Sequence, residues 1–397
     1  MWVCAAAKDL AGNVGFSSPV EFKVDKDAPY FEKISTDKPY YKDGDEIEVT
    51  IWVDDETSGI QRTLVDFTPL GGTVEECSLQ QDGSYLCQST VNQPLDGTYE
   101  VPVIAEDLAS NENQTYIDVI VDNTPPVIVS ITGNISVEVD QLILIEVSIT
   151  DEISGVGKVE LCYAKLGGDT TCVPMTENEV FQAEIPAQSE STTIVYNITA
   201  VDNVGNVVIS GDYYVRVYDL VINLVPGWNL ISIPREVSNP EIGDLFSGGD
   251  LLYYYDPSQG WLFCKVGDAC EFDELEPLKG YWVYTDDYER IGVDYERISG
   301  NKTPLPSLEL QPGWNLIGHT ATSPMYADEA LISLTDVSCF LDSCMYSYSY
   351  AYVIGYVDGL FINIYTPGYS EPLLMYPGMG YWIYMKEAAT LLGIEEN

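Results

Sequence analysis

The chain has 397 residues, of which 63 are acidic and 17 basic, giving a net charge of −46 with a single histidine. Such a surface cannot neutralise phosphates, which makes nucleic acid a poor partner, and one histidine excludes most His-based catalytic and zinc sites. No apolar run reaches the roughly 18–20 residues that span a bilayer as a helix. The 46% apolar content is that of a folded chain, and at about 100–150 residues per domain we expect three to five domains.

The N-terminal half contains an internal repeat. The motif A-x-D-x-(A/V)-(G/S)-N occurs at Ala7–Asn13, Ala105–Asn111 and Ala200–Asn206, and each copy runs into an alternating strand. A second landmark, DETSGI at Asp55–Ile60, matches DEISGV at Asp151–Val156. The first landmark recurs at offsets of 98 and 95 residues and the second at 96, so a repeat unit has about 96 residues.

Between these landmarks the pattern is β throughout. The stretches EIEVTIWVDD and QLILIEVSITDE alternate apolar and polar residues, and turn residues recur every 8–12 positions or so. About seven short strands in one unit is typical of an immunoglobulin-like sandwich. We therefore expect Ig-like domains at 29–124 and 125–220, and in 1–28 only the last two strands of a truncated one. The A-x-D-x-(A/V)-(G/S)-N motif resembles the tandem Ig-like repeats of prokaryotic surface proteins and adhesins. We expect the Ig-like units to act as spacers.

Beyond Asp219 a different repeat begins, rich in Trp, Tyr and Gly. LVPGWNLISIP at Leu224–Pro234 matches LQPGWNLIGHT at Leu310–Thr320, and LEPLKGYWVYTDD at Leu275–Asp287 matches MYPGMGYWIYMKE at Met375–Glu387. We expect the PGWN strand of each repeat to pair with its GYW strand. The paired motif resembles a module of archaeal and bacterial S-layer-like surface proteins, and that resemblance implies a location but no activity.

Each of these repeats, 221–300 and 301–397, is predicted to run strand, short helix, hairpin, strand. Asn239 and Ser323 are the expected helix caps, each followed by a proline. Neither repeat alone is expected to bury enough surface to fold, so 221–397 is predicted to be one domain. The predicted fold class is all-β with minor α: tandem Ig-like sandwiches followed by a double-repeat β-rich domain with short helices.

The cysteines fall into close pairs that suit disulfide-stapled hairpins. In the first two pairs a glycine-containing turn lies at the midpoint, which places the cysteines opposite each other. Free buried thiols are the alternative, and zinc is disfavoured because no CxxC occurs. Cys4 has no close partner. The predicted disulfide residues are Cys77, Cys87, Cys162, Cys172, Cys264, Cys270, Cys339 and Cys344.

Stapled hairpins indicate an oxidising compartment, and hence an extracellular or cell-surface protein. The start MWVCAAAKDL lacks the features of a secretion signal, so the export signal is expected upstream of this chain. N-x-S/T triplets are consistent with glycosylation at Asn113, Asn134, Asn197 and Asn301.

Acidic residues gather where the Ig-like units join, next to the loops that begin at Asp55-Glu56 and Asp151-Glu152. Calcium takes six to eight or so oxygen ligands from carboxylates and carbonyls, so loops of successive domains could share a stiffening ion. The alternative is that these residues form Asx-turns without metal. The candidate calcium residues are Asp25, Asp27, Asp107, Asn111, Asp122, Asp202 and Asn206.

Aromatic residues are the candidates for contact with a ligand. Trp228, Trp261, Trp282, Trp314 and Trp382 are expected in the core, since the motifs recur in both repeats; a platform that stacks on sugar rings is the alternative. The less symmetric tyrosine runs are the preferred surface candidates, although neighbouring residues of a strand face opposite sides. These tyrosines are Tyr253, Tyr254, Tyr255, Tyr346, Tyr348, Tyr350 and Tyr352.

No P-loop, G-x-S-x-G or H-E-x-x-H motif is present. The leading hypothesis is a non-enzymatic extracellular structural or adhesive protein, a segment of a cell-surface, S-layer-like or filament-forming subunit. Its expected partners are further copies of itself, neighbouring surface proteins or glycans. The alternatives are an accessory carbohydrate-binding region of a larger secreted hydrolase, and an assembly protein that pairs edge strands through residues 1–28.

Overall fold

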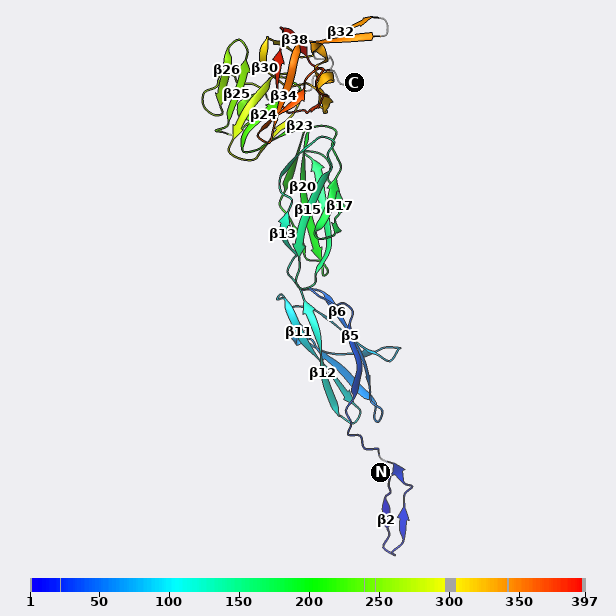
Figure 1. Cartoon of the computed structure of the whole chain (residues 1–397). Coiled ribbons are helices and arrows are strands. Elements are labelled where there is room, and N and C mark those ends of the chain that lie inside the picture. The colour runs from blue at the N-terminus through cyan, green and yellow to red at the C-terminus, as the bar shows by residue number, and fades with distance from the viewer. Residues whose placement is uncertain are drawn as a thin grey trace.

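The chain forms an elongated series of β domains, seen in a computed structural model that describes residues 2–21, 23–238, 240–246, 248–296, 305–340 and 343–394. A narrow N-terminal arm, two sandwiches and a larger C-terminal domain follow one another end to end (Figure 1). The predicted all-β fold class is confirmed. No helix in the described part of the chain has the length and hydrophobicity of a membrane span.

The first sandwich packs two four-stranded sheets around one core. Ile47, Val49 and Ile51 are fully buried and alternate with neighbours that are half-buried or exposed, as a strand with one face in the core requires. One sheet has the order β5 (Tyr30–Thr36), β6 (Glu46–Asp54), β10 (Tyr85–Thr90), β9 (Ser78–Leu79); the other has β12 (Glu112–Val121), β11 (Gly97–Asp107), β7 (Ile60–Asp66), β8 (Val74–Glu76). A 3-10 turn, η1, spans Thr68–Leu70.

The second sandwich repeats this arrangement. Its core includes Ile145, Leu161 and Ile198 at 0% exposure. One sheet has the order β13 (Val127–Ile131), β15 (Ile143–Thr150), β19 (Phe181–Ile185), β18 (Thr176–Glu177); the other has β14 (Ile135–Glu138), β22 (Tyr213–Tyr218), β20 (Thr192–Asp202), β16 (Val156–Lys165), β17 (Thr171–Pro174), with β21 (Val207–Ile209) beside β20. Strands β14 and β22 are parallel, and both sandwiches have the two-sheet architecture of Ig-like domains.

The C-terminal domain contains two equivalent four-stranded sheets, one from each repeat. In both, the PGWN strand pairs with the GYW strand, as predicted. The first sheet has the order β24 (Gly227–Ser232), β27 (Gly280–Thr285), β25 (Leu251–Asp256), β26 (Gly260–Lys265); the second has β30 (Gly313–Ile317), β37 (Tyr381–Met385), β34 (Tyr350–Val357), β35 (Leu360–Tyr365).

Smaller ladders and short helical turns complete the domain, and all but the last ladder pack against the inner face of a sheet. The ladders are β23 (Leu220–Leu224) with β28 (Glu289–Val293), β29 (Ser307–Leu310) with β38 (Ala389–Leu392), β31 (Met325–Tyr326) with β36 (Leu374–Met375), and β32 (Thr335–Phe340) with β33 (Ser343–Tyr348), a hairpin that projects from the domain (Figure 1). The helical turns are α1 (Ile242–Leu245), α2 (Ala327–Ala330) and η2 (Ile332–Leu334).

The predicted helix cap at Ser323 is wrong. Residues 325–326 first pair with β36, so α2 begins only at Ala327, with Tyr326 at the N-cap. The equivalent α1 begins at Ile242 after Glu241, and Asn239 lies outside the described residues.

The two C-terminal repeats interlock. The backbone nitrogen of Gly380 donates to Leu230 at 3.0 Å, and that of Ser232 donates to Gly378 at 2.9 Å. In the mirrored contact, the nitrogen of Gly318 donates to Leu278 at 2.9 Å, and Leu278 is buried in the core of the second repeat. Each GYW segment therefore rests against the PGWN strand of the other repeat.

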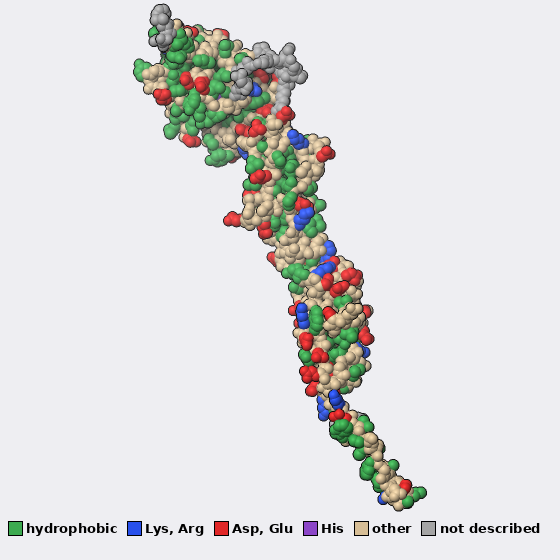
Figure 2. Space-filling view, turned by 90° about the vertical axis from the view of Figure 1, so that its right-hand side faces the viewer, with side chains coloured by type: hydrophobic (Ala, Val, Ile, Leu, Met, Phe, Trp, Pro, Cys, Tyr) green, Lys and Arg blue, Asp and Glu red, His purple; other side chains and the backbone are tan. Residues whose placement is uncertain are grey.

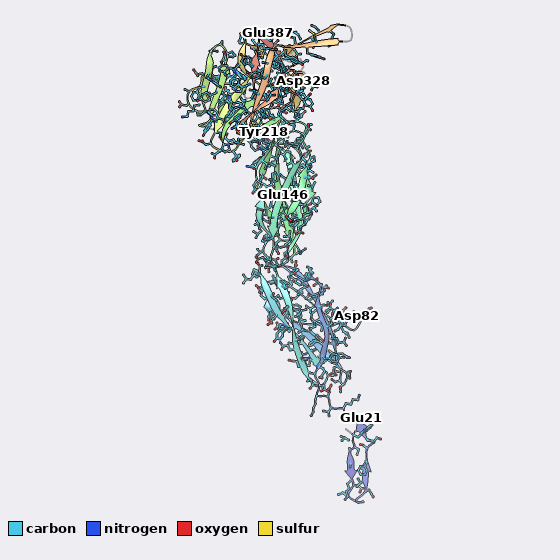
Figure 3. The ribbon with its side chains drawn as sticks, viewed as in Figure 1. Glu21, Asp82, Glu146, Tyr218, Asp328 and Glu387 are labelled. Carbon is cyan, nitrogen blue, oxygen red and sulfur yellow. A yellow bond between two sulfur atoms is a disulfide. The ribbon has the colours of Figure 1, made fainter. Side chains whose placement is uncertain are left out.

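The second sandwich joins the C-terminal domain without a flexible linker, because β23 starts two residues after β22 ends. Figure 3 places Tyr218 at this junction. Arg216 pairs with Asp294 at 2.6 Å, and the nitrogen of Val221 donates to the Glu138 carboxylate at 2.9 Å.

The N-terminal arm is a two-stranded ribbon, in which β1 (Trp2–Val3) pairs with β4 (Val20–Glu21) and β2 (Ala6–Lys8) with β3 (Val14–Phe16). Every residue of these strands is exposed. The Asp9 carboxylate accepts bonds from the backbone and side-chain nitrogens of Asn13, both at 2.8 Å. Asp107 and Asn111 make the same contacts in the first sandwich.

Candidate functional site

The PGWN motif builds a turn that directs its tryptophan away from the core. Gly227 has a φ of 101°, a conformation that L side chains rarely adopt. The side chain of Asn229 then closes the turn, accepting from the nitrogen of Val225 at 3.0 Å and donating to its carbonyl at 2.8 Å. Trp228, held between them, lies opposite Tyr284 on the outer face of the sheet.

The second repeat uses the same geometry. Gly313 has a φ of 99°, and Asn315 bonds the nitrogen and carbonyl of Gln311 at 3.0 and 2.7 Å. Trp314 lies opposite Tyr384. The motif is thus explained residue by residue: glycine for the turn, asparagine to close it, tryptophan for the outer face.

The three residues of the GYW motif have three separate roles. A Cβ on Gly280 would lie 2.8 Å from the carbonyl oxygen of Ile317 in the other repeat, so the close approach of the repeats requires glycine. Tyr281 is buried and its hydroxyl accepts from the backbone nitrogen of Glu276 at 2.9 Å. Trp282, the next residue along the strand, points to the opposite, outer face.

The tyrosine-rich hairpins extend this outer face in both repeats. In the first repeat Tyr253 lies opposite both Trp282 and Phe263, and Tyr255 lies opposite Trp261. In the second repeat the corresponding residues come from β34 and β35, paired as Ile354–Trp382, Tyr352–Tyr384 and Tyr356–Phe361.

Ring contacts join the two faces across the boundary between repeats. Trp382 lies 5.8 Å from Trp261 and 5.6 Å from Tyr255, measured between ring centroids. Trp282 lies 4.7 Å from Tyr356. The outer faces of the two sheets therefore meet at their edges and form a shared aromatic groove that is open to solvent.

The groove consists of two adjoining depressions of about 680 and 480 Å³. Its rings remain accessible: Trp261 is 52% exposed and Phe361 62%, and Figure 2 shows hydrophobic side chains gathered on the C-terminal domain. The first depression is lined by Trp228, Tyr253, Trp261, Trp282, Tyr356, Phe361 and Trp382, and the second by Tyr255, Trp261, Trp314, Ile354, Phe361 and Trp382.

The structure corrects the expected placement of the tryptophans. They were expected in the core, yet all five lie on the outer face, with Trp228, Trp261 and Trp314 exposed and Trp282 and Trp382 half-buried. Recurrence in both repeats indicated a shared role, but it could not tell a shared core from a shared surface.

Two of the preferred tyrosines are core residues. Tyr254 is 7% exposed and Tyr350 is fully buried, so neither offers a contact surface. They are in-facing members of alternating strands. The remaining tyrosines differ among themselves: Tyr253 and Tyr255 line the groove, Tyr352 stacks on Tyr384 near Trp314, Tyr348 packs on the core of the second repeat, and Tyr346 is 59% exposed on the projecting hairpin.

The structure contains all four disulfides that the cysteine spacing predicts, at Cys77–Cys87, Cys162–Cys172, Cys264–Cys270 and Cys339–Cys344. Cys162 and Cys172 are direct cross-strand partners, as the midpoint turn implies. Cys4 is free and exposed.

The predicted glycosylation residues have different surroundings. Asn134 is exposed in the bend between β13 and β14. Asn113 lies in β12 and its side chain donates to the carbonyl of Pro29 at 2.7 Å, whereas Asn197 lies in β20 and donates to Asp212 at 3.2 Å. Asn301 lies outside the described residues.

Acidic residues converge at both joints of the Ig-like units. Carboxylate oxygens of Asp122, Asp151 and Asp202 lie within 4.8 Å of one another, and Asp25, Asp55 and Asp107 form the same group one repeat earlier. Four of these six residues are candidates from the sequence, and the other two, Asp55 and Asp151, come from the adjacent loops. Asp27 is outside both groups.

The asparagines of the motif hold these carboxylates. Asn206 donates from its side chain to the Asp202 carboxylate at 2.7 Å and to the Asp122 carbonyl at 3.0 Å, which ties the joint to the second sandwich. Asn111 donates to Asp107 at 2.7 Å in the same way. Their amide nitrogens thus face the aspartates.

Hydrogen bonding favours the ionised form of two of these groups. Backbone nitrogens of Gly59 and Ser58 donate to Asp55 and hold the pKa of its carboxyl below the usual range. Burial opposes ionisation of Asp107, but bonds from Asn111 outweigh it and lower the pKa of this carboxyl. Clustered, ionised oxygen ligands suit a hard cation such as calcium.

Comparisons with known proteins give little beyond the fold. A family model described as "Domain of unknown function (DUF7743)" matches residues 120–240, less than a third of the chain. No curated protein matches the sequence.

Among solved structures, the chain is similar to an I-band fragment of titin, I67–I69, at 12% identity over 72% of this chain and 93% of that one, with a TM-score of 0.32. It is also similar to a tetra-tandem repeat from the extending region of a large adhesion protein, at 14% identity over 79% and 76% of the two chains, with a TM-score of 0.22. Likenesses this distant carry no argument about function.

Proposed function

We propose that the protein is a non-enzymatic, extracellular structural or adhesive protein, a segment of a cell-surface, S-layer-like or filament-forming subunit. In this role the Ig-like sandwiches are a spacer and the C-terminal domain makes the contact. The observation that carries the proposal is the aromatic groove of the C-terminal domain. Figure 1 shows that this domain lies at one end of an elongated array.

The energetic argument rests on exposed aromatic area. Removing apolar surface from water contributes about 25 cal/mol of favourable free energy for each Å². Aromatic side chains that stay exposed do not gain this free energy until a partner covers them. Contiguous exposed apolar patches usually mark binding sites, and tryptophan and tyrosine dominate binding hot spots. Trp228 and Trp261, at 42% and 52% exposure, are placed to supply such contacts.

The disulfides support export. Four of them staple hairpins in the two sandwiches and the C-terminal domain, and such bonds persist in oxidising compartments. The acidic surface, with a net charge of −46, favours solubility and discourages non-specific association.

The proposal is tested by binding of the labelled full chain to cell-envelope preparations of its source organism. Trp261→Ala and Trp382→Ala are expected to lower retention at least about tenfold, the effect of losing one hot-spot side chain. Tyr288→Ala is the matched control, because Tyr288 is an 81% exposed aromatic of the same domain that lines neither depression. Unchanged retention of both tryptophan variants would refute the role of the groove.

The second candidate is an accessory carbohydrate-binding region of a larger secreted hydrolase. Aromatic rings in a groove favour it, since sugar rings stack on such side chains. Retention of the wild-type chain, but not of Trp261→Ala, on an insoluble polysaccharide would support this role. The structural role is favoured if the tryptophan variants lose envelope binding while the wild-type chain is not retained on any polysaccharide tested.

We further propose that calcium binds the joints at Asp25–Asp55–Asp107 and Asp122–Asp151–Asp202. Three carboxylates within 4.8 Å of one another repel each other unless a cation or a proton neutralises them. Millimolar calcium should therefore raise the unfolding temperature of the sandwiches, and Asp122→Asn should reduce the rise. A melting temperature that is the same in calcium and in chelator would end this proposal.

A further inference from the structure

The groove is lined by aromatic side chains and a single isoleucine, Ile354. Among the described residues, no lysine, arginine, aspartate or glutamate lines either depression. A ligand in it would meet ring faces and edges, with few polar partners. The composition of the lining therefore restricts the chemistry of what can bind.

The rings form walls rather than a flat platform. Trp261 and Trp382 meet at an interplanar angle of 80°, and Trp314 meets Trp382 at 82°. At the other end, Trp228 and Trp282 meet at 87°. Because neighbouring rings are nearly perpendicular, they offer no single flat platform for the face of a sugar, whereas a compact, rounded group can contact ring faces and edges together.

The electrostatic surroundings favour a cation. The chain carries a net charge of −46, and residues 221–397 contain 25 acidic against 7 basic residues. Asp358 lines a depression that adjoins the groove and shares Trp228 and Tyr356 with it. Such a field repels anionic ligands and raises the local concentration of cations.

The absence of charged lining residues then selects among cations. A primary ammonium group carries three N–H donors, which would lack acceptors against ring faces and would cost desolvation energy. A quaternary ammonium group has no N–H donor, and aromatic faces attract it through their quadrupoles. Its methyl groups can also pack against the rings.

We propose that the aromatic groove binds a quaternary alkylammonium group, held between Trp261, Phe361 and Trp382, the side chains shared by both depressions. This inference rests on the proposed contact function and names the chemistry that the contact recognises. The ligand is a neutral or cationic molecule that presents such a head group.

Calorimetric titration of the full chain with choline chloride tests the inference, with 3,3-dimethylbutanol as the neutral isostere and sodium chloride as the ionic control. Choline is expected to bind at least about tenfold more tightly than the isostere, the ratio that one desolvated cation–π contact supplies. The affinity should fall at least about tenfold in Trp261→Leu and Trp382→Leu, which keep apolar volume but lose the ring face, and should be unchanged in Tyr288→Ala. Far-ultraviolet circular dichroism verifies that the variants fold.

Equal affinity for choline and the isostere would overturn the inference, because it would show an apolar site without cation recognition. Binding of a neutral oligosaccharide without choline binding would also overturn it and support the carbohydrate role. Absence of choline binding, together with loss of envelope retention in Trp261→Ala, would refute the cationic ligand and leave the proposed contact function standing.

Discussion

The contact between the two C-terminal repeats can be tested by adding a single methyl group at Gly380. A Cβ on Gly380 would lie 2.6 Å from the carbonyl oxygen of Ile231 and 3.0 Å from a side-chain methyl of Leu230. A carbonyl of the backbone cannot rotate away as a side chain can. Gly380→Ala must therefore separate the two repeats at this point.

The cost follows from two terms. Adding a methyl group to a packed interface costs about 1–3 kcal/mol. Separation also weakens the hydrogen bond from the Gly380 nitrogen to Leu230, at 3.0 Å, which contributes about 0.5–1.5 kcal/mol. The total of about 2–4 kcal/mol corresponds to a fall of roughly 5–15 °C in the unfolding temperature of a domain this size.

Intrinsic tryptophan fluorescence is the suitable assay, since five of the seven tryptophans lie in the C-terminal domain. Thermal unfolding of the full chain followed in this way reports mainly on the repeats. Gly243→Ala is the control, because a Cβ there meets nothing within 4 Å and alanine is the better helix former. Equal unfolding temperatures for Gly380→Ala and the parent chain would refute the interlocked arrangement.

Three further predictions concern single side chains. Asn315→Ala should destabilise the C-terminal domain by about 1–3 kcal/mol in urea, more than Asn229→Ala, because Asn315 is the more deeply buried of the two turn-closing residues; equal effects would contradict this. Gly292→Ala should shift the same transition downward, since its Cβ would lie 2.2 Å from the ring of Tyr218, and Tyr218→Ala should partly restore it. Because the pKa of Asp55 is lowered in the folded state, its stabilisation is present near neutral pH and is lost as the pH falls through that lowered pKa; acid-induced unfolding followed by circular dichroism should be shallower in Asp55→Asn.

Much of the fold could be predicted because repetition in the sequence reports directly on repetition in space. The offset of 96 residues that relates Asp55 to Asp151 also relates equivalent loops of the two sandwiches. Likewise, the ten-residue spacing of Cys162 and Cys172 fixed both their turn and their cross-strand pairing. In these cases local sequence determines the geometry.

The side of the strand that faces outward could not be predicted in the C-terminal repeats. Alternation implies that Tyr253 and Tyr254 face opposite sides, but both faces of the sheet are aromatic, so composition does not identify the core side. The choice is made by contacts distant in sequence: Gly280 approaches Ile317 of the other repeat, which fixes Tyr281 inward and Trp282 outward. The sequence of one repeat, taken without the repeat that it packs against, carries no signal for that choice.

The same reasoning explains why the groove lies where the two repeats meet. Duplication supplied two sheets whose outer faces each carry a tryptophan pair, Trp228 with Trp282 and Trp314 with Trp382. Interlocking through Gly280 and Gly380 brings these faces to a common boundary, so neither repeat alone would contain the complete groove. Loosening the interface should therefore weaken ligand binding as well as stability. Gly380→Ala tests this link, because loss of stability with full choline affinity would separate the groove from the contact that we hold responsible for it.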